Sequence, residues 1–325
     1  MVALMLASPS TTAGSVVKCS ARNLMGLRVS GCDYHGGVGG GGRFPSFLPK
    51  EVHQIKDPLA RTLAQRIQRL PVQTKFAESC IMSSCVKPRV ESETNPVFLL
   101  EWRGSYPLLE DAGLEVWAVD ILGWGFSDLE ILPSCSASSK RYHLYQLWKS
   151  HIKRPMILVG PSLGAAVAID FAVNFPEASL ENITDMSNMF CLLAQQLSQH
   201  VSLLKSIPLR MYANSLFFDG ISLTTSLDWT NVGRLHCLLP WWEDATVNYM
   251  LSGGYNVIGQ IKQVKQKALI IWGQRNHVIS SEAALRLHDE LPDSIIHHLP
   301  NTGHVPRVEN PSSVANLIAD FAQGE

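Results

Sequence analysis

The sequence predicts an α/β fold: a mostly parallel central sheet covered by helices on both faces, with a helical insertion. Three observations support this fold class. Short apolar segments alternate with helical segments between residues 95 and 178, as in β-α-β-α proteins. Segments such as 96–100 and 156–159 are continuously apolar, which is typical of strands buried on both faces of a parallel sheet. The alternation stops at residue 180 and returns at residue 268.

These changes of pattern divide the chain into three parts. Residues 1–49 form an N-terminal targeting segment and linker, residues 50–325 form the α/β domain, and residues 180–262 are a helical cap inserted within that domain. A chain of 325 residues with 46% hydrophobic content is long enough to bury one large core of this kind.

The N-terminal segment has the composition of an organelle transit peptide. Its first 32 residues contain no acid, and Lys18, Arg22 and Arg28 lie among Ser, Thr and Ala. The glycines of residues 36–42 then form a flexible linker. We therefore expect delivery to an organelle; the alternative is an N-terminus that is merely disordered.

The composition argues against several classes of protein. The formal net charge is −1, and no run of Lys and Arg forms a phosphate-binding surface, which argues against nucleic acid as a partner. The seven cysteines include no C-x-x-C pair, which argues against a disulfide framework and a zinc site. The longest apolar stretch, 156–173, is interrupted by Gly160, Pro161 and Asp170, so we expect no membrane span.

Hydrophobic spacing predicts the remaining elements. Apolar residues recur at helical intervals from Leu59 to Leu70, and we expect that helix to be a surface flap. An edge strand is predicted within 74–86. Further strands are predicted at 115–120, 268–272 and 294–299, and helices at 106–111, 140–151, 163–174, 281–291 and 311–322.

A candidate nucleophile lies in the sequence Gly160-Pro161-Ser162-Leu163-Gly164. This segment matches G-x-S-x-G between an apolar strand and an alanine-rich helix, so the serine is expected on a strained strand-to-helix turn. Side chains in place of Gly160 and Gly164 would collide with neighbouring backbone. The Leu163 N–H, at the start of the helix, is a natural donor to an oxyanion. The alternative is that the motif occurs by chance in a chain with 23 glycines.

A candidate base follows the predicted strand 294–299. Gly303-His304 comes 142 positions after Ser162, so the serine precedes the histidine in chain order. We predict that His304 is the catalytic base. The alternative is a surface histidine, since the chain contains ten others.

The chain resembles the α/β hydrolases, in particular plant plastid members, over residues 95–178 and 200–322. The motifs that carry the resemblance are the elbow, the later histidine and a D-x-x-G-x-G-x-S segment from Asp120 to Ser127. The resemblance implies a hydrolase fold with a serine nucleophile and a chloroplast location, in the stroma or at a membrane periphery. It gives the segment 120–127 a structural role beside the elbow.

The chain departs from the family pattern at the catalytic acid. The family's G-x-x-D-x-V segment reads Gly273-Gln-Arg-Asn276-His-Val278 here. Asn276 is expected to accept the N–H of His304 through its side-chain oxygen, but it cannot offset the charge of an imidazolium. In serine proteases the equivalent change lowers kcat roughly 10⁴-fold, which is about 5.5 kcal/mol of barrier. Asp185, where a few relatives place the acid, is an alternative.

Two further departures concern the oxyanion hole and the core. The family's H-G loop is absent, because the chain passes from Leu100 directly to Glu101-Trp102-Arg103. Losing one oxyanion donor typically lowers kcat about 10²- to 10³-fold, unless the backbone of Glu101 or Trp102 replaces it. Segment 179–185 is too polar for the buried strand that should follow residue 178, so a core strand is expected to be missing. These departures indicate a non-catalytic paralogue or an aberrant gene model.

The predicted cap is rich in aromatic residues. Trp229, Trp241 and Trp242 lie among Leu and Met residues, in the segment that closes over the serine in this family. We therefore expect these tryptophans to bind a lipophilic ester. The alternative is that they pack the cap onto the core.

The leading hypothesis is a serine hydrolase of the carboxylic-ester type with a degraded triad. Ser162 attacks a lipophilic ester or related acyl substrate, His304 transfers the proton, and no metal or organic cofactor is required. The rival is a non-catalytic binding or receptor-like protein of the same fold, which Asn276 and the missing H-G loop favour. A cofactor-free lyase or C–C bond hydrolase is a third, weaker option.

Overall fold

The computed structural model describes residues 43–100, 105–129, 133–185, 198–254 and 256–324, with the backbone alone for 180–185 and 198–200. The predicted targeting segment and its glycines lie outside these residues. Residues 43–49, which the sequence assigned to the linker, already belong to the folded unit: Phe44 and Phe47 pack against the core, and Leu48 is buried. The folded chain therefore begins by residue 43, earlier than the predicted boundary at residue 50.

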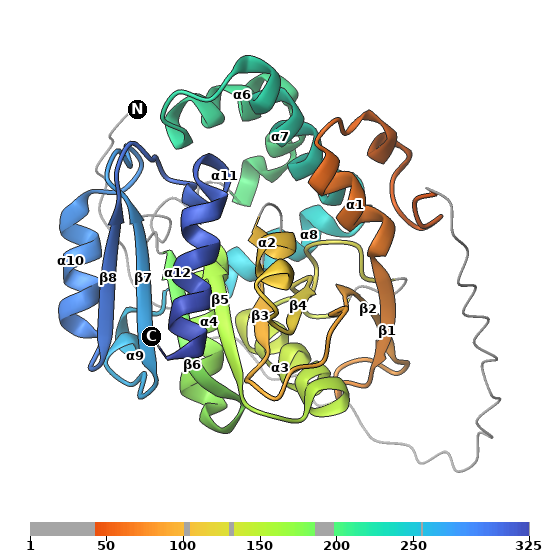
Figure 1. Ribbon diagram of the computed structural model, residues 1–325. Coiled ribbons are helices and arrows are strands. Elements are labelled where there is room, and N and C mark those ends of the chain that lie inside the picture. Colours follow the sequence, from red (N-terminus) through yellow and green to blue (C-terminus); the bar gives the residue numbers. More distant parts are fainter. Residues whose placement is uncertain (1–42, 101–104, 130–132, 186–197, 255, 325) are drawn as a thin grey trace, which may run out of the picture. The chain divides into compact units, whose positions relative to one another are not determined.

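Within the described residues, eight strands form one sheet in the order β1-β2-β4-β3-β5-β6-β7-β8 (Figure 1). β2 pairs antiparallel with β1 and β4, whereas the pairs from β4 to β8 are all parallel. This mostly parallel sheet confirms the predicted fold class. The strands are β1 (Gln68–Val72), β2 (Ile81–Val86), β3 (Val97–Leu99), β4 (Val116–Val119), β5 (Met156–Pro161), β6 (Ser179–Asp185), β7 (Lys267–Gly273) and β8 (Ser294–Leu299).

Helices cover both faces of the sheet, as predicted (Figure 1). α2 and α12 share one core cluster with β3, β4 and β7, and α3, α4, α9 and α10 contribute to clusters on the other face. The buried alanines of α4 let that helix lie close to the strands. The helices of the core are α2 (Ser105–Asp111), α3 (Ala137–Leu147), α4 (Leu163–Asn174), α10 (Ser281–Glu290), α11 (Pro306–Glu309) and α12 (Pro311–Gln323).

The predicted loss of a core strand is wrong. Segment 179–185 forms β6, which pairs in parallel with β5 on one side and with β7 on the other. Pairing on both edges satisfies the backbone N–H and C=O groups of this segment, so the strand forms despite its polar sequence. The sheet is therefore continuous from β5 to β7, and residues 180–185, which we assigned to the cap, belong to the sheet.

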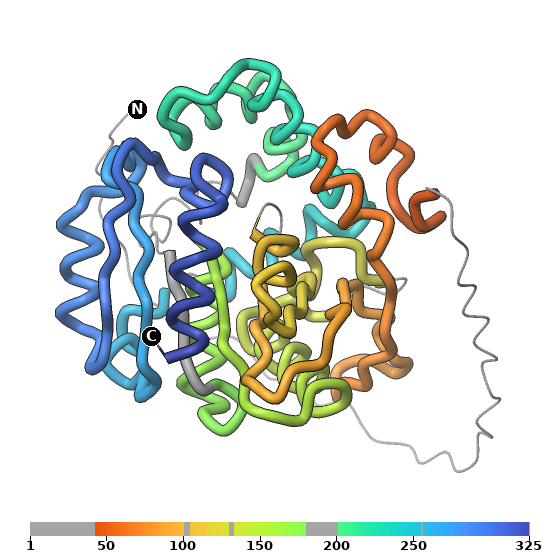
Figure 2. The backbone as a smooth tube through the Cα atoms, viewed as in Figure 1, coloured from red at the N-terminus to blue at the C-terminus, as the bar shows by residue number. Residues whose placement is uncertain are grey.

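The cap is helical, as the sequence predicts, and α6 and α7 lie over one end of the sheet (Figures 1 and 2). That end of the sheet carries the predicted catalytic base, because α6 contacts the loop after β8, which contains His304. The described elements of the cap are a 3₁₀ helix at Ser198–Lys205, α6 (Ile207–Phe217), α7 (Leu223–Leu235), α8 (Trp242–Leu251) and α9 (Ile258–Ile261). No helix in the described part of the chain is both long and apolar enough to cross a bilayer.

The N-terminal helix is shorter and more buried than predicted. α1 spans Pro58–Arg66, and the last apolar residue of the predicted helix, Leu70, lies in β1 instead. Leu63 of α1 is only 2% exposed. The Asp57 N–H, just before α1, donates to the carboxylate of Asp228 in α7 at 2.9 Å. The helix is thus joined to the cap and buries one face, while its other face is exposed, so it is an anchored surface helix and not a loose flap.

Candidate active site

Ser162 lies on the sharp turn between β5 and α4. Its φ of 49° and ψ of −115° are strained for a residue with a side chain. A Cβ atom built at Gly160 would lie 2.3 Å from the carbonyl oxygen of Gly164, so a larger residue does not fit there. The strained turn that the G-x-S-x-G motif predicts is therefore present at Ser162.

The first residue of α4 is Leu163, and its N–H lies at the helix N-terminus beside Ser162. Amides in the first turn of a helix have no partner within the helix and carry partial positive charge, which suits an oxyanion. Leu163 and Leu100 both line the cavity described below. The segment 101–104, to which we assigned a possible second oxyanion donor, lies outside the described residues.

His304 and Asn276 are brought together by a close approach of two loops. A Cβ at Gly273, at the end of β7, would lie 2.0 Å from the carbonyl oxygen of Gly303. The Arg275 N–H donates to the carbonyl of Thr302 at 2.9 Å. Asn276 Nδ2 consequently lies 3.2 Å from Nδ1 of His304.

The cap holds the histidine from the other side. The His304 N–H donates to the carbonyl of Phe217, the last residue of α6, at 2.7 Å. The rings of Phe217 and His304 are 5.4 Å apart between centroids. His304 is only 4% exposed, so bulk water screens its charge poorly.

The amide orientation of Asn276 is fixed by its backbone neighbours. Its Oδ1 accepts the N–H groups of Val278 at 3.0 Å and Ile279 at 3.1 Å. Turning the amide over would place its NH₂ group against both donors, at a cost of about 1–3 kcal/mol for each buried amide left without an acceptor. The NH₂ group therefore faces His304.

This orientation corrects the predicted role of Asn276. The oxygen expected to accept the His304 N–H is already occupied by backbone amides, and Nδ2 is a donor. A neutral imidazole can accept at Nδ1 only when its proton is on Nε2. A general base of the serine-triad type needs the opposite tautomer, with Nε2 free to take the serine proton.

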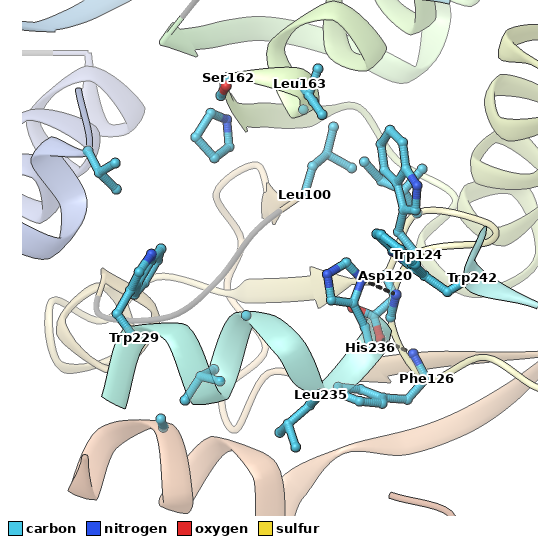
Figure 3. A pocket seen from close by; sticks show the side chains of 18 of the residues that line it. Leu100, Asp120, Trp124, Phe126, Ser162, Leu163, Trp229, Leu235, His236 and Trp242 are labelled. Atoms are coloured by element: carbon cyan, nitrogen blue, oxygen red, sulfur yellow. Dashed lines mark hydrogen bonds between the residues drawn. The ribbon is translucent and has the colours of Figure 1, made fainter. Parts of the chain in front are cut away.

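Ser162, Leu163 and His304 line one cavity of about 510 Å³, which is large enough for a small-molecule ligand. In Figure 3, Ser162 and Leu163 lie on one side of this cavity and Trp229, from α7, lies on the other. Trp229 and Trp242, two of the three predicted substrate-binding residues, both line it. Trp241 is not part of the lining and packs against the core clusters instead.

The segment 120–127 has a structural role beside the elbow, as the resemblance to α/β hydrolases implied. Asp120 accepts the Phe126 N–H at 2.9 Å and the hydroxyl of Ser84, and the Ser127 hydroxyl accepts the Ser84 N–H at 3.0 Å. Asp120 and Phe126 also line the cavity. These bonds hold the floor of the cavity in place.

Sequence reasoning missed several residues of the cavity. Arg210, Arg307 and His236 line it, as does Leu63 of α1. Burial, followed by the nearby charges of Arg210 and Lys140, lowers the pKa of His236 to about 3, so this imidazole is neutral near pH 7. No sequence motif marks these positions. They come from separate parts of the chain, namely α1, the cap and α11, and only folding brings them to one cavity.

Asp185 is the alternative to Asn276 as the acid partner of His304. It is the last residue of β6, and its backbone is paired with Pro161 of β5. Its side chain lies outside what the structure describes. Asn276, by contrast, contacts Nδ1 of His304.

Comparison with known proteins decides the family. No protein-family model matches the chain. The Arabidopsis thaliana protein named alpha/beta hydrolase domain-containing protein VTE7 is 49% identical over 304 residues, which cover 88% of this chain and 92% of that protein. The chain belongs to the α/β-hydrolase family. This α/β hydrolase thus has a plant relative, in agreement with the predicted resemblance.

More distant similarities agree with this assignment. The 2-hydroxy-6-oxo-6-phenylhexa-2,4-dienoate hydrolase of Burkholderia cepacia is 26% identical over 187 residues, covering 50% of this α/β hydrolase and 61% of that enzyme. Among solved structures, the meta-cleavage product hydrolase CumD aligns with a TM-score of 0.60 at 17% identity, covering 78% and 99% of the two chains. A thermophilic esterase from Thermogutta terrifontis aligns with a TM-score of 0.61 at 15% identity, covering 79% and 98%. At these identities the solved structures show the fold alone.

Proposed function

We propose that this α/β hydrolase is a slow serine hydrolase that acts on a lipophilic ester or related acyl substrate. The observation that carries the proposal is the strained backbone of Ser162, in the same cavity as His304. Strain of this kind costs about 1–3 kcal/mol and persists where the surrounding structure enforces it, commonly at functional sites.

The proposed reaction uses side chains and backbone alone. Ser162 Oγ attacks the ester carbonyl while His304 takes its proton, and the oxyanion accepts the Leu163 N–H. His304 then returns the proton to the leaving alcohol, and water hydrolyses the acyl-enzyme by the same route. The carboxylic acid and the alcohol are the products.

Asn276 makes this reaction slow. Its NH₂ group favours the His304 tautomer with the proton on Nε2, so only the minor tautomer accepts the serine proton. An amide also provides no negative charge to stabilise the imidazolium that forms during attack. Trp229 and Trp242 are proposed to contact the lipophilic part of the ester, and Trp241 is assigned a packing role.

The second candidate function is a ligand-binding protein without turnover. The orientation of Asn276 favours it, because the same amide that weakens the base leaves the cavity intact. C–C bond hydrolysis is a third candidate, since several relatives are named as hydrolases of 2-hydroxy-6-oxo dienoates.

Labelling with a fluorophosphonate probe separates the first two functions. The probe reacts with an activated serine, so we expect slow labelling of the wild type and none of Ser162→Ala. Binding of a lipophilic ester without any labelling of the wild type would replace the hydrolase proposal with the binding protein. Ser312→Ala is the matched control, because Ser312 is an exposed residue of α12 outside the cavity lining.

We further propose that the protein acts in the chloroplast. The first 32 residues, which contain no acid, and the plant relative support this location. A fluorescent protein fused after residue 49 is expected to accumulate in plastids of leaf cells. Accumulation in the cytosol would contradict the proposed location.

A further inference from the structure

The charged residues in the wall of the cavity are mostly cationic. Arg210 and Arg307 line it together with a single acid, Asp120. That acid is engaged on the cavity floor, where it accepts the Phe126 N–H and the Ser84 hydroxyl. Most of the other lining residues are aliphatic or aromatic, so the field of the Arg210 guanidinium is weakly screened.

Arg210 is held in one position by the cap. It lies on α6, its Nε donates to the carbonyl of Leu204, and its Nη2 donates to Sγ of Cys237 at 2.9 Å. Burial raises the pKa of Cys237 to about 11, so near pH 7 this sulfur is a thiol without charge. Neither contact therefore neutralises the guanidinium.

Arg210 also differs from other partly buried arginines of this chain. Arg66, Arg69 and Arg141 each pair with a carboxylate at 2.9 Å or less. Among the described residues, no carboxylate pairs with Arg210. A guanidinium in an apolar wall without a counter-charge is costly, and an anionic ligand group would remove that cost.

The remaining nitrogen of Arg210 lies beside a glycine of the cavity wall. A Cβ built at Gly233 would lie 3.1 Å from Nη1, and Gly233 itself lines the cavity. Gly233 lies within α7, where glycine is disfavoured relative to alanine. A methyl group at this position would lie against Nη1, so the glycine keeps this side of the guanidinium clear of a side chain.

A second cation approaches from the core. Arg307 lies on α11, three residues after His304, and its guanidinium carbon is 5.8 Å from the ring centroid of Trp229. Cap and core thus each contribute one cation to the cavity that contains Ser162.

We propose that the ligand of this cavity is an anionic amphiphile, whose carboxylate or phosphate group binds Arg210 at Nη1 while its apolar chain fills the cavity. This names the substrate class for the function proposed above and rests on the same cavity. Arg307 adds to the positive potential. A charge-assisted hydrogen bond to such a group is stronger than a bond between neutral partners.

Calorimetric titration of the full chain carrying Ser162→Ala tests the proposal, because binding is then measured without turnover. The probes are decanoate, decyl phosphate and the neutral decan-1-ol. We expect at least one anion to bind about tenfold or more tightly than the alcohol. The tighter anion identifies the headgroup as carboxylate or phosphate.

Further variants, each in the same background, locate the effect. Arg210→Gln is expected to abolish the preference for the anion, and Gly233→Ala to reduce it, because its new methyl group lies against Nη1. Arg286→Gln, which removes an exposed positive charge of α10, is the matched control and should keep the preference. Gly233→Ala retains both arginines and so remains informative if Arg210→Gln fails to fold.

Equal affinities for the anions and the alcohol would overturn the proposal, as would an unchanged preference in both Arg210→Gln and Gly233→Ala. A clear preference for the anion in a chain that no fluorophosphonate labels would uphold the subsite while refuting the hydrolase function.

Discussion

Replacing Asn276 by Asp should raise the rate of the proposed ester hydrolysis. One oxygen of the new carboxylate is expected to keep the N–H bonds of Val278 and Ile279, and the other would lie where Nδ2 now lies, 3.2 Å from Nδ1 of His304. This oxygen can only accept, so it favours the tautomer with the proton on Nδ1 and leaves Nε2 free to take the serine proton.

The expected magnitude follows from the geometry. Two unit charges 3.2 Å apart interact by about 5 kcal/mol at an effective dielectric constant of about 20. This agrees with the loss of about 5.5 kcal/mol that corresponds to a 10⁴-fold decrease in kcat for the equivalent change in serine proteases. Since the loss of an oxyanion donor typically limits kcat by about 10²- to 10³-fold independently of the acid, we expect a rise in kcat of about 10²- to 10⁴-fold.

The assay is hydrolysis of p-nitrophenyl butyrate by the wild type and by Asn276→Asp. Asn256→Asp adds the same charge at an exposed loop position outside the cavity lining and should leave kcat unchanged. Combining Asn276→Asp with Ser162→Ala should remove the gain. A folded Asn276→Asp protein without any rise in kcat would refute the account of the histidine tautomer.

Three further predictions concern stability and binding. Burial lowers the pKa of Lys140 from its ordinary value of 10.5 to about 7. Between these two pH values the folded chain binds fewer protons than the unfolded chain, so its stability increases with pH. The melting temperature should therefore rise with pH across this interval, and it should rise less in Lys140→Met. An equal rise in both proteins would contradict this. Trp229→Leu should raise KM for long-chain p-nitrophenyl esters, whereas Trp241→Leu should not; the reverse order would show that the lining is misassigned. Gly160→Ala should lower the free energy of unfolding in urea by about 1–3 kcal/mol or more, since its methyl group would lie 2.3 Å from the Gly164 oxygen; a stability equal to wild type would contradict the elbow geometry.

Much of the fold was predictable because its signals are local. The apolar segments of β3, β5 and β7 and the G-x-S-x-G turn each specify their own structure. The polar segment of β6 misled the prediction, because its strand forms through backbone pairing with β5 and β7. The apolar spacing of α1 predicted a helix correctly, but it gave no information about the cap residues that cover it.

The candidate site was predictable in part, for a similar reason. Motifs in the sequence identified Ser162, His304 and Asn276 as residues of the candidate site. The direction of the Asn276 amide could not, because it depends on two backbone N–H groups placed by the turn after β7. Arg210 has no motif, and its place in the cavity wall follows from the packing of α6 against α7.

The most direct test of the central claim is the protonation state of the His304 ring. In ¹⁵N NMR spectra of histidine-labelled protein, with His304 assigned by its loss in His304→Gln, the two ring nitrogens can be distinguished by their shifts. We predict a proton on Nε2 and a bare Nδ1 in the wild type, and the opposite tautomer in Asn276→Asp. A wild-type His304 with its proton on Nδ1 would contradict the account.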